Sequence, residues 1–320
     1  MLNEDSRILV TGSAGFIGSN LVHYLQNNGY NFVHLDGLFA GSNLENLDGI
    51  KIPLIEMDLA DDKTTDKLYT LFLDKKITHI IHLAANSHVD RSISGDAEFW
   101  RSNVVGTANL LRTARRYGGI SCIINQITDE FWGERPEEAA KETDSPAPTS
   151  PYPCSKAGQY FVGKAYRTTY NLPIISTFPV NCYGPRQAEE KLIPKFTTNL
   201  LSGKKVPLMA STHFERDWLP VIDICKAFIL LLEKGTPGED YNIGADRHHT
   251  NMEITKKLIQ LCGRDDSYIE IVPDRAAHDC RYAVDSTKIK DLGFSLSCDF
   301  DEYLKLTVDW YKEKYAKGAH

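Results

Sequence analysis

Two groups of side chains have the types and the spacing needed to move protons. Thr128, Asp129 and Glu130 are adjacent and follow the apolar run CIIN. Carboxylates at a strand end most often lie in a solvated loop, so this trio needs a structural context before a chemical role follows. Tyr152 and Lys156 are four residues apart, where a helix is expected to begin after a Pro-rich stretch, and therefore share one helical face. A phenol has a pKa of about 10, and a neighbouring ammonium group favours its ionised form, so this pair could act as a base toward an alcohol.

A glycine-rich turn supplies that context. Gly12, Gly15 and Gly18 lie in TGSAGFIGSN, between an apolar run and a segment with helical spacing. Glycines at such a turn let the backbone approach a pyrophosphate, which binds at the positive N-terminus of the helix. Asp36 ends the second apolar run; it would accept hydrogen bonds from ribose hydroxyls and repel a 2′-phosphate, which predicts NAD rather than NADP. Asp58 ends the third run and is predicted to contact the adenine.

The runs that must position these residues alternate with helical segments. Six short runs rich in β-branched residues are continuously apolar, at residues 7–11, 31–36, 53–58, 79–84, 122–127 and 173–178. Segments with helical spacing lie between them, at 16–29 and 103–118 for example. Continuously apolar strands that alternate with helices indicate a parallel sheet covered on both faces. The sequence therefore predicts a doubly wound α/β fold of the Rossmann type.

The alternation becomes irregular after about residue 180, where Pro and Gly become frequent. We predict an NAD-binding Rossmann domain at 1–180, with a return segment near 215–250. The rest of 181–320 is predicted to form a smaller, mixed C-terminal lobe that contains most of the substrate contacts. Helices in that lobe are expected around residues 191–202, 251–262 and 301–315.

Composition excludes several classes of protein. The chain has 320 residues, 42% of them hydrophobic and 25% charged, which is enough to bury a full core. Its net charge of -7 is not concentrated in a tail and no basic cluster is present, so nucleic acid is not expected as a partner. No apolar run reaches the roughly twenty residues of a membrane span, and the start MLNEDSR does not resemble a signal peptide, so a cytoplasmic location is expected. The seven cysteines include no CxxC pair and predict reduced thiols without a metal site.

The glycine turn followed by Tyr-x-x-x-Lys resembles the extended short-chain dehydrogenase/reductase family, which acts on nucleotide sugars. Within that family, TDE before an aromatic residue and Gly resembles the nucleotide-diphosphate-glucose 4,6-dehydratases, and most closely those that act on dTDP-glucose. The likeness covers nearly the whole chain. It includes the stretches HLAANSHVDRSI, SNVVGTANLL, NCYGPRQ, EKLIPKF, RDWL, YNIG and DRAAHDCRYAVD.

The resemblance implies a dehydration with no net change in oxidation state. Tyr152, assisted by Lys156 and Thr128, would remove the C4 hydroxyl proton as hydride moves to NAD. The C4 ketone then acidifies the C5 proton, which Glu130 would remove while Asp129 protonates the departing C6 hydroxyl, and hydride returns to C6. One ionised and one protonated carboxyl must therefore lie side by side, which burial and mutual repulsion can produce.

The resemblance also implies which residues bind the two ligands. NAD would be held by Gly12, Gly15, Phe16, Ile17, Gly18, Asp36, Asp58, Leu59, Ala84, Ala85, Ser87, Ser102, Tyr152 and Lys156. The nucleotide sugar would be held by Ser87, His88, Thr128, Asn181, Lys191, Leu192, Arg216, Asn251, Arg275 and His278. Among these, the cations Lys191, Arg216 and Arg275 suit the diphosphate.

Several positions depart from the family pattern. Ile127 stands where Ser is usual, Phe178 where Arg is usual, Cys182 and Asn86 alter NNYGP and AAES, and Phe131 and Trp132 replace Val-Tyr. Because these positions are expected beside the cofactor and the sugar, we predict that they change the substrate or the affinity for NAD. The nucleotide base, the exact sugar and the pathway that uses the product stay open.

Two alternative functions stay open as well. An NDP-sugar 4-epimerase or a UDP-glucuronate decarboxylase of the same superfamily would need no carboxylate pair at 129 and 130. A non-catalytic NAD-binding sensor would usually have lost the tyrosine or the lysine. The family likeness also implies a homodimer, formed by the helices near 99–117 and 152–170.

Overall fold

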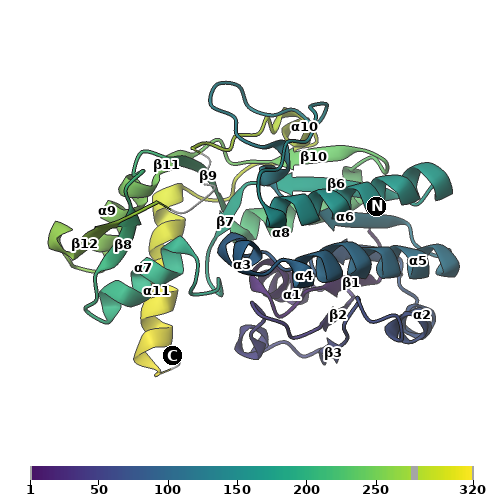
Figure 1. Ribbon diagram of the computed structural model, residues 1–320. Coiled ribbons are helices and arrows are strands. Elements are labelled where there is room, and N and C mark those ends of the chain that lie inside the picture. Colours follow the sequence, from purple (N-terminus) through teal and green to yellow (C-terminus); the bar gives the residue numbers. More distant parts are fainter. Residues whose placement is uncertain (1, 275–279, 319–320) are drawn as a thin grey trace.

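The computed structural model describes residues 2–274 and 280–318. Its main feature is a seven-stranded sheet with the strand order β10-β6-β5-β4-β1-β2-β3, in which all neighbouring strands are parallel. The strands are β1 (Ile8–Thr11), β2 (Phe32–Asp36), β3 (Ile55–Glu56), β4 (His79–His82), β5 (Cys122–Gln126), β6 (Ile174–Pro179) and β10 (Asp240–Ile243). Figure 1 shows helices on both faces of this sheet, so the predicted doubly wound fold is confirmed.

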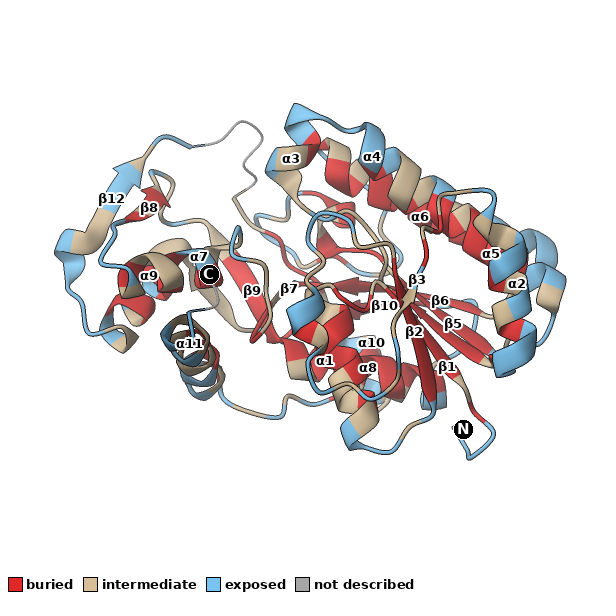
Figure 2. Ribbon diagram, turned by 90° about the horizontal axis from the view of Figure 1, so that it is seen from below, coloured by how far each residue is buried: buried red, intermediate tan, exposed pale blue. Residues whose placement is uncertain are grey.

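The two faces of the sheet bury different side chains of the same strands. On one face, Val10 and Ile124 pack with α1 (Phe16–Asn27) and α8 (Val221–Lys234). On the other face, Leu9 and Ile123 pack with α2 (Thr64–Lys75) and α5 (Thr107–Tyr117). Figure 2 shows the resulting concentration of buried residues along the strands. Since successive strand residues point to opposite faces, burial of both faces requires the continuously apolar runs seen in the sequence.

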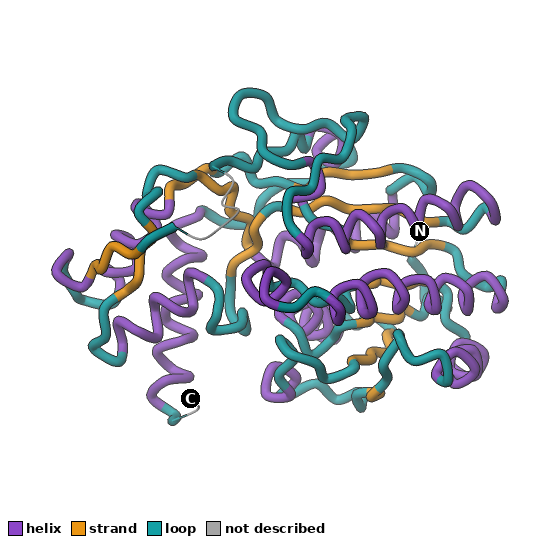
Figure 3. The backbone as a smooth tube through the Cα atoms, viewed as in Figure 1, coloured by secondary structure: helices purple, strands orange, loops and turns teal. Residues whose placement is uncertain are grey.

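The smaller lobe has two short sheets and three helices (Figure 3). One sheet contains β7 (Asn181–Tyr183), β9 (Glu215–Pro220) and β11 (His248–Thr250), and the other pairs β8 (Val206–Met209) with β12 (Ile269–Val272). The helices that pack on them are α7 (Leu192–Leu201), α9 (Asn251–Leu261) and α11 (Phe300–Ala316). The short helix α10 (Thr287–Asp291) lies instead beside β10. The sheets of the lobe contain both parallel and antiparallel pairs, as predicted for a mixed lobe.

The predicted return segment near 215–250 is divided between the two parts of the molecule. Its α8 and β10 complete the main sheet, whereas β9 and β11 belong to the smaller lobe. No apolar run of the sequence analysis predicted β10, because its sequence DYNI is half polar. Its polar residues are nevertheless buried, since Asp240 bonds with Arg167 and Asn242 with Trp132.

None of the helices in residues 2–274 and 280–318 combines the length and the apolarity required of a membrane span.

Candidate functional site

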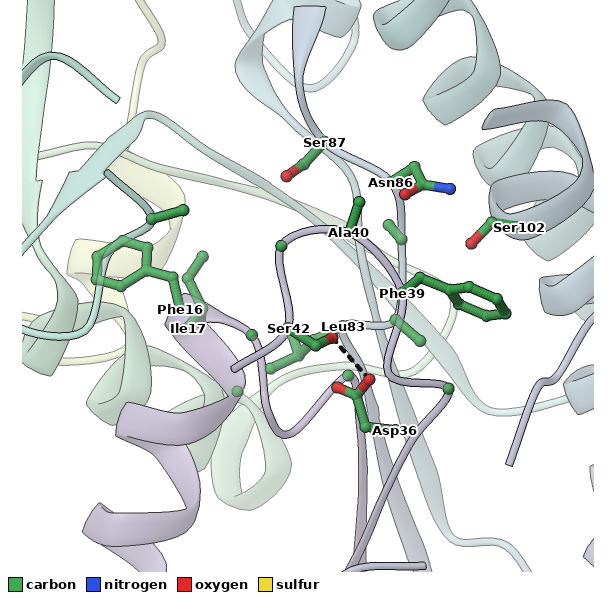
Figure 4. A pocket seen from close by; sticks show the side chains of 18 of the residues that line it. Phe16, Ile17, Asp36, Phe39, Ala40, Ser42, Leu83, Asn86, Ser87 and Ser102 are labelled. Carbon is green, nitrogen blue, oxygen red and sulfur yellow. Dashed lines mark hydrogen bonds between the residues drawn. The ribbon is translucent and has the colours of Figure 1, made fainter. Parts of the chain in front are cut away.

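A deep pocket opens at the carboxyl ends of the main strands. It encloses about 1170 Å³, counting the part open to solvent, and Gln187, Ala188, Glu190 and Lys191 line it just before α7. Figure 4 shows Phe16 and Ile17 on one side of this pocket and Asn86, Ser87 and Ser102 on the other. Every residue assigned to NAD from the sequence lines it: Gly12, Gly15, Phe16, Ile17, Gly18, Asp36, Asp58, Leu59, Ala84, Ala85, Ser87, Ser102, Tyr152 and Lys156. A pocket of this size suits an extended dinucleotide.

The glycine turn leaves room for an anion at the start of α1. Gly12 adopts a positive φ of 72°, and a Cβ atom there would lie 2.7 Å from the backbone nitrogen of Ala84. A Cβ atom on Gly18 would clash with the carbonyl oxygen of Gly12, so both positions require glycine. Gly15 caps the helix, and no acidic residue occupies its first turn. The free N–H groups and the helix dipole therefore face the pocket without a competing carboxylate, which fits a pyrophosphate.

The carboxylate of Asp36 organises the neighbouring loop. It accepts hydrogen bonds from the backbone nitrogens of Ala14 (2.9 Å) and Leu38 (2.7 Å) and from the hydroxyl of Ser42 (2.7 Å; Figure 4). A carboxylate has about four acceptor positions, so little capacity is left for the two ribose hydroxyls predicted to bind it. Its negative charge still opposes a 2′-phosphate.

Asp58, the predicted adenine contact, forms an ion pair with Arg101 and accepts a hydrogen bond from the backbone nitrogen of Ala60 at 2.9 Å. Arg101 precedes Ser102 and belongs to the π-helical segment Trp100–Gly106. No motif in the sequence indicated Arg101, because the pairing spans 43 positions of the chain. An adenine that bound Asp58 would share the Asp58 carboxylate with the Arg101 guanidinium.

The structure brings the predicted proton-transfer residues together. Thr128 is the N-cap of the short 3-10 helix Asp129–Trp132, and its hydroxyl donates to Asp129 Oδ1 at 3.2 Å. It is also close enough to Tyr152 to lower the pKa of the phenol. Asp129 is only 4% exposed. Burial, together with the charge of Glu130, raises the pKa of Asp129 to about 8, and the positive charge of Arg216 opposes this rise. Asp129 is therefore a protonated acid at neutral pH beside a second carboxyl group, as the proposed division of roles requires.

Tyr152 and Lys156 lie in the first turns of α6 (Pro151–Tyr170). The helix begins with proline, which lacks an N–H, and the backbone nitrogen of Tyr152 donates to Ser92 Oγ at 3.2 Å. Burial is the main cause that raises the pKa of Tyr152 well above its ordinary value, and burial lowers the pKa of Lys156 to about 7. Burial therefore opposes the ionisation of the phenol that a neighbouring ammonium group favours.

A glutamine that the sequence analysis missed holds the lysine. Lys156 Nζ donates to the backbone oxygen of Gln126 at 2.7 Å and to Gln159 Oε1 at 2.5 Å. Gln159 is fully buried and one helical turn beyond Lys156. That spacing on the same helical face is a signal that could have found it.

The residues predicted to bind the sugar are only partly gathered. Ser87 and Lys191 line the pocket, and Lys191 Nζ donates to the Ser87 carbonyl oxygen at 3.3 Å. Arg216 is 7% exposed, donates to the Glu215 carbonyl oxygen at 2.7 Å, and is close enough to influence Asp129. Arg216 and Thr128 do not line the pocket. Four others also lie outside its lining: His88 at the N-cap of helix Val89–Ser94, Asn181 on β7, Leu192 at the start of α7 and Asn251 at the start of α9. Arg275 and His278 lie outside the described residues.

The structure corrects the expectation that the family departures all lie beside the ligands. Phe178 is fully buried and packs against Phe131, Trp132 and Tyr160, with ring centroids 4.9, 4.7 and 5.7 Å away. This aromatic cluster (Phe131, Trp132, Tyr160 and Phe178) belongs to the core, and none of its members lines the pocket. Ile127 is likewise buried in the core, whereas Asn86 does line the pocket. Cys182 is close enough to Tyr152 to raise its pKa, and Asp129 is close enough to Cys182 to raise the pKa of the thiol.

Restoring the usual arginine by Phe178→Arg is therefore expected to destabilise the chain instead of improving its activity. Loss of a buried Phe costs about 3–5 kcal/mol, and an unpaired buried charge adds to that cost. Urea unfolding measures the change, with Leu306→Arg as the control because Leu306 is 51% exposed on α11. The control should change the free energy of unfolding by about 0.5 kcal/mol or less. Equal stability of both variants would contradict the placement of Phe178 in the core.

Asp129 also makes stability depend on pH. Its pKa is about 8 in the folded chain, whereas an unfolded Asp has a pKa of about 3.9. Between these values the folded chain holds a proton that the unfolded chain releases, so the free energy of unfolding falls as pH rises. Asp129→Asn removes this contribution, so its Tm relative to the unaltered protein should increase steadily from about pH 4 to about pH 8. Thermal unfolding across that range measures the difference, which would be constant if Asp129 were ionised throughout.

Several known proteins are similar to this chain in fold and in sequence. A family model described as GDP-mannose 4,6 dehydratase matches residues 9–307. A dTDP-glucose 4,6-dehydratase of Streptomyces niveus is 39% identical over 323 residues, covering 97% of this chain and 94% of that protein. The crystal structure of DesIV, a dTDP-glucose 4,6-dehydratase from Streptomyces venezuelae with NAD and TYD bound, has a TM-score of 0.92 and 38% identity and covers 97% and 98% of the two chains. A UDP-glucose 4-epimerase of Thermus thermophilus in complex with NAD has a TM-score of 0.88 and 31% identity, covering 96% and 99%. The family resemblance predicted from the motifs is confirmed: this chain belongs to the GDP-mannose 4,6-dehydratase family.

Proposed function

We propose that this chain is an NAD-dependent hydro-lyase that converts a nucleotide-diphosphate glucose to its 4-keto-6-deoxy sugar. The expected substrate is dTDP-glucose. The observation that carries this proposal is the buried Asp129, whose pKa of about 8 keeps it protonated beside Glu130. The Thr128 hydroxyl donates to this acid and is close enough to Tyr152, which lines the pocket, to lower its pKa. The relatives named dTDP-glucose 4,6-dehydratase support the choice of nucleotide.

The glycine turn and the start of α1 would hold the cofactor pyrophosphate, and Asp36 would select against a 2′-phosphate. When bound, NAD supplies a reversible hydride acceptor. With NAD bound, the positive charge of its nicotinamide would favour the phenolate of Tyr152, which would take the proton of the C4 hydroxyl. Lys156 is held beside it by the Gln126 backbone oxygen and the Gln159 side chain. Glu130 takes the C5 proton, and Asp129 gives its proton to the departing C6 hydroxyl, which leaves as water. Return of hydride to C6 and of a proton to C5 would complete the 4-keto-6-deoxy sugar.

The alternative functions would leave some of these residues without a role. An NDP-sugar 4-epimerase or a UDP-glucuronate decarboxylase has no need of a buried, protonated carboxyl beside a second one, although an epimerase shares the fold. A sensor without catalytic activity would not need Tyr152, Lys156, Asp129 and Glu130 to be retained together.

The proposal is tested by incubating the protein and NAD with dTDP-, UDP-, GDP- and CDP-glucose and measuring the product mass. Loss of one water is expected, fastest with dTDP-glucose. An epimer would keep the mass of its substrate, and a decarboxylase would act only on a uronic acid. Unchanged mass with all four sugars would contradict the proposal.

The division at residue 180, the assignment of the sugar site and the cytoplasmic location stay predictions. The homodimer is also a prediction. It gains support from exposed apolar side chains on the two helical segments expected to pair, with Val105 42% and Phe161 49% exposed.

A further inference from the structure

Two residues paired in register near the carboxyl ends of β5 and β6 each have a buried polar side-chain atom. Gln126 Oε1 and Thr177 Oγ1 are both buried and have no hydrogen-bond partner among the described residues. Gln126 pairs in register with Thr177, so both side chains project from the same face of the sheet. This is the face that packs with α1 and α8, since it also carries Ile124 and Ile175.

Gln126 is fixed at the reacting end of the pocket. Its backbone oxygen accepts hydrogen bonds from Lys156 Nζ at 2.7 Å and from Gln159 Nε2 at 3.2 Å. It lines the pocket together with Tyr152 and Lys156. Two side chains of α6 thus bind the backbone oxygen of Gln126. The side-chain amide of Gln126 remains to interact with a ligand.

A buried amide oxygen without a partner is unfavourable, and most such atoms in folded proteins are satisfied. The acceptor is neutral, so a neutral N–H or O–H donor matches it, whereas a phosphate does not. Asp129 and Glu130, the carboxylates that would serve the sugar, lie instead in the 3-10 helix that follows Thr128. The donor that belongs beside Tyr152 and Lys156 on the cofactor is the primary carboxamide of the nicotinamide ring.

We propose that Gln126 Oε1 accepts a hydrogen bond from the nicotinamide carboxamide and thereby fixes the orientation of the ring. This inference rests on the proposed use of NAD. It makes Gln126 a residue that discriminates between cofactors by the substituent on the ring. No pattern in the sequence predicted a role for Gln126.

The test compares the Kd of NAD with that of 3-acetylpyridine adenine dinucleotide, in which a methyl group replaces the carboxamide nitrogen. Isothermal titration of the full chain measures both, so no catalytic turnover is needed. The unaltered protein is expected to bind NAD about tenfold more tightly, because a site built to hydrogen-bond a ligand N–H disfavours an analogue that lacks it. Gln126→Met should weaken NAD binding about tenfold and leave the analogue nearly unchanged, so that the ratio falls to about one.

Gln187→Met is the matched control. Gln187 also lines the pocket, its Oε1 is likewise buried without a partner, and its Nε2 donates to the Cys182 carbonyl oxygen at 3.0 Å. This variant should keep the tenfold ratio. An unchanged ratio in Gln126→Met, or a ratio lost only in Gln187→Met, would overturn the inference. Failure of the unaltered protein to bind NAD at all would instead overturn the proposed function.

Discussion

Replacing Asp129 with Asn is expected to slow water loss from dTDP-glucose by about 10²–10⁴, the usual range for losing a general acid. The amide has nearly the same shape, so the hydrogen bonds that Asp129 Oδ1 accepts from Thr128 and from the Glu130 backbone nitrogen can persist. What disappears is the acidic proton that the buried carboxyl keeps up to a pH of about 8. Oxidation at C4 should continue at least in part, because Tyr152 is unchanged. Absorbance of the reduced nicotinamide reports that step, and mass spectrometry reports the loss of water.

Glu130→Gln should block water loss at the same stage by removing the base for the C5 proton. The control is Glu142→Gln. Burial also raises the pKa of Glu142, but this carboxylate accepts the backbone N–H of Asn242 at 2.9 Å and does not line the pocket. Its variant should dehydrate the sugar normally. If Asp129→Asn and Glu130→Gln both dehydrated normally as well, the roles assigned to the two carboxyls would be wrong.

Tyr152→Phe is expected to reduce oxidation at C4 by about 10²–10⁴, and with it every later step, because the phenolate is the base for the first proton. Tyr152 is only 8% exposed, so removal of its hydroxyl changes little of the surface. Rapid mixing with dTDP-glucose, followed by the absorbance of the reduced nicotinamide, measures this step directly.

Tyr160→Phe is the matched control for this experiment. Tyr160 lies on the same helix, its pKa is raised to about 12, and its hydroxyl donates to Asp240 Oδ2 at 2.8 Å. Loss of that hydrogen bond should lower stability without slowing oxidation at C4. Rapid C4 oxidation by Tyr152→Phe would remove the phenol from the mechanism.

Local patterns in the sequence were sufficient for the parts of the site whose geometry depends on neighbouring residues. Gly12 and Gly18 follow from a turn that admits no Cβ atom, and Tyr152 and Lys156 follow from the spacing of one helical face. Six of the seven main strands were visible as apolar runs, because burial on both faces leaves little freedom in composition. β10 was not, because its polar side chains are buried against partners far away in the chain.

The sequence by itself thus determined the fold class and the cofactor turn, and it predicted which residues transfer protons. The tertiary structure decided the environment of these residues: burial is the largest cause that raises the pKa of the Asp129 carboxyl and of the Tyr152 phenol. It also decided that Phe178 belongs to the core and that Gln126 lines the pocket. The physical reason is the same in each case. A pKa and a packing environment depend on groups that surround a side chain in space, and those groups come from segments that no local pattern connects.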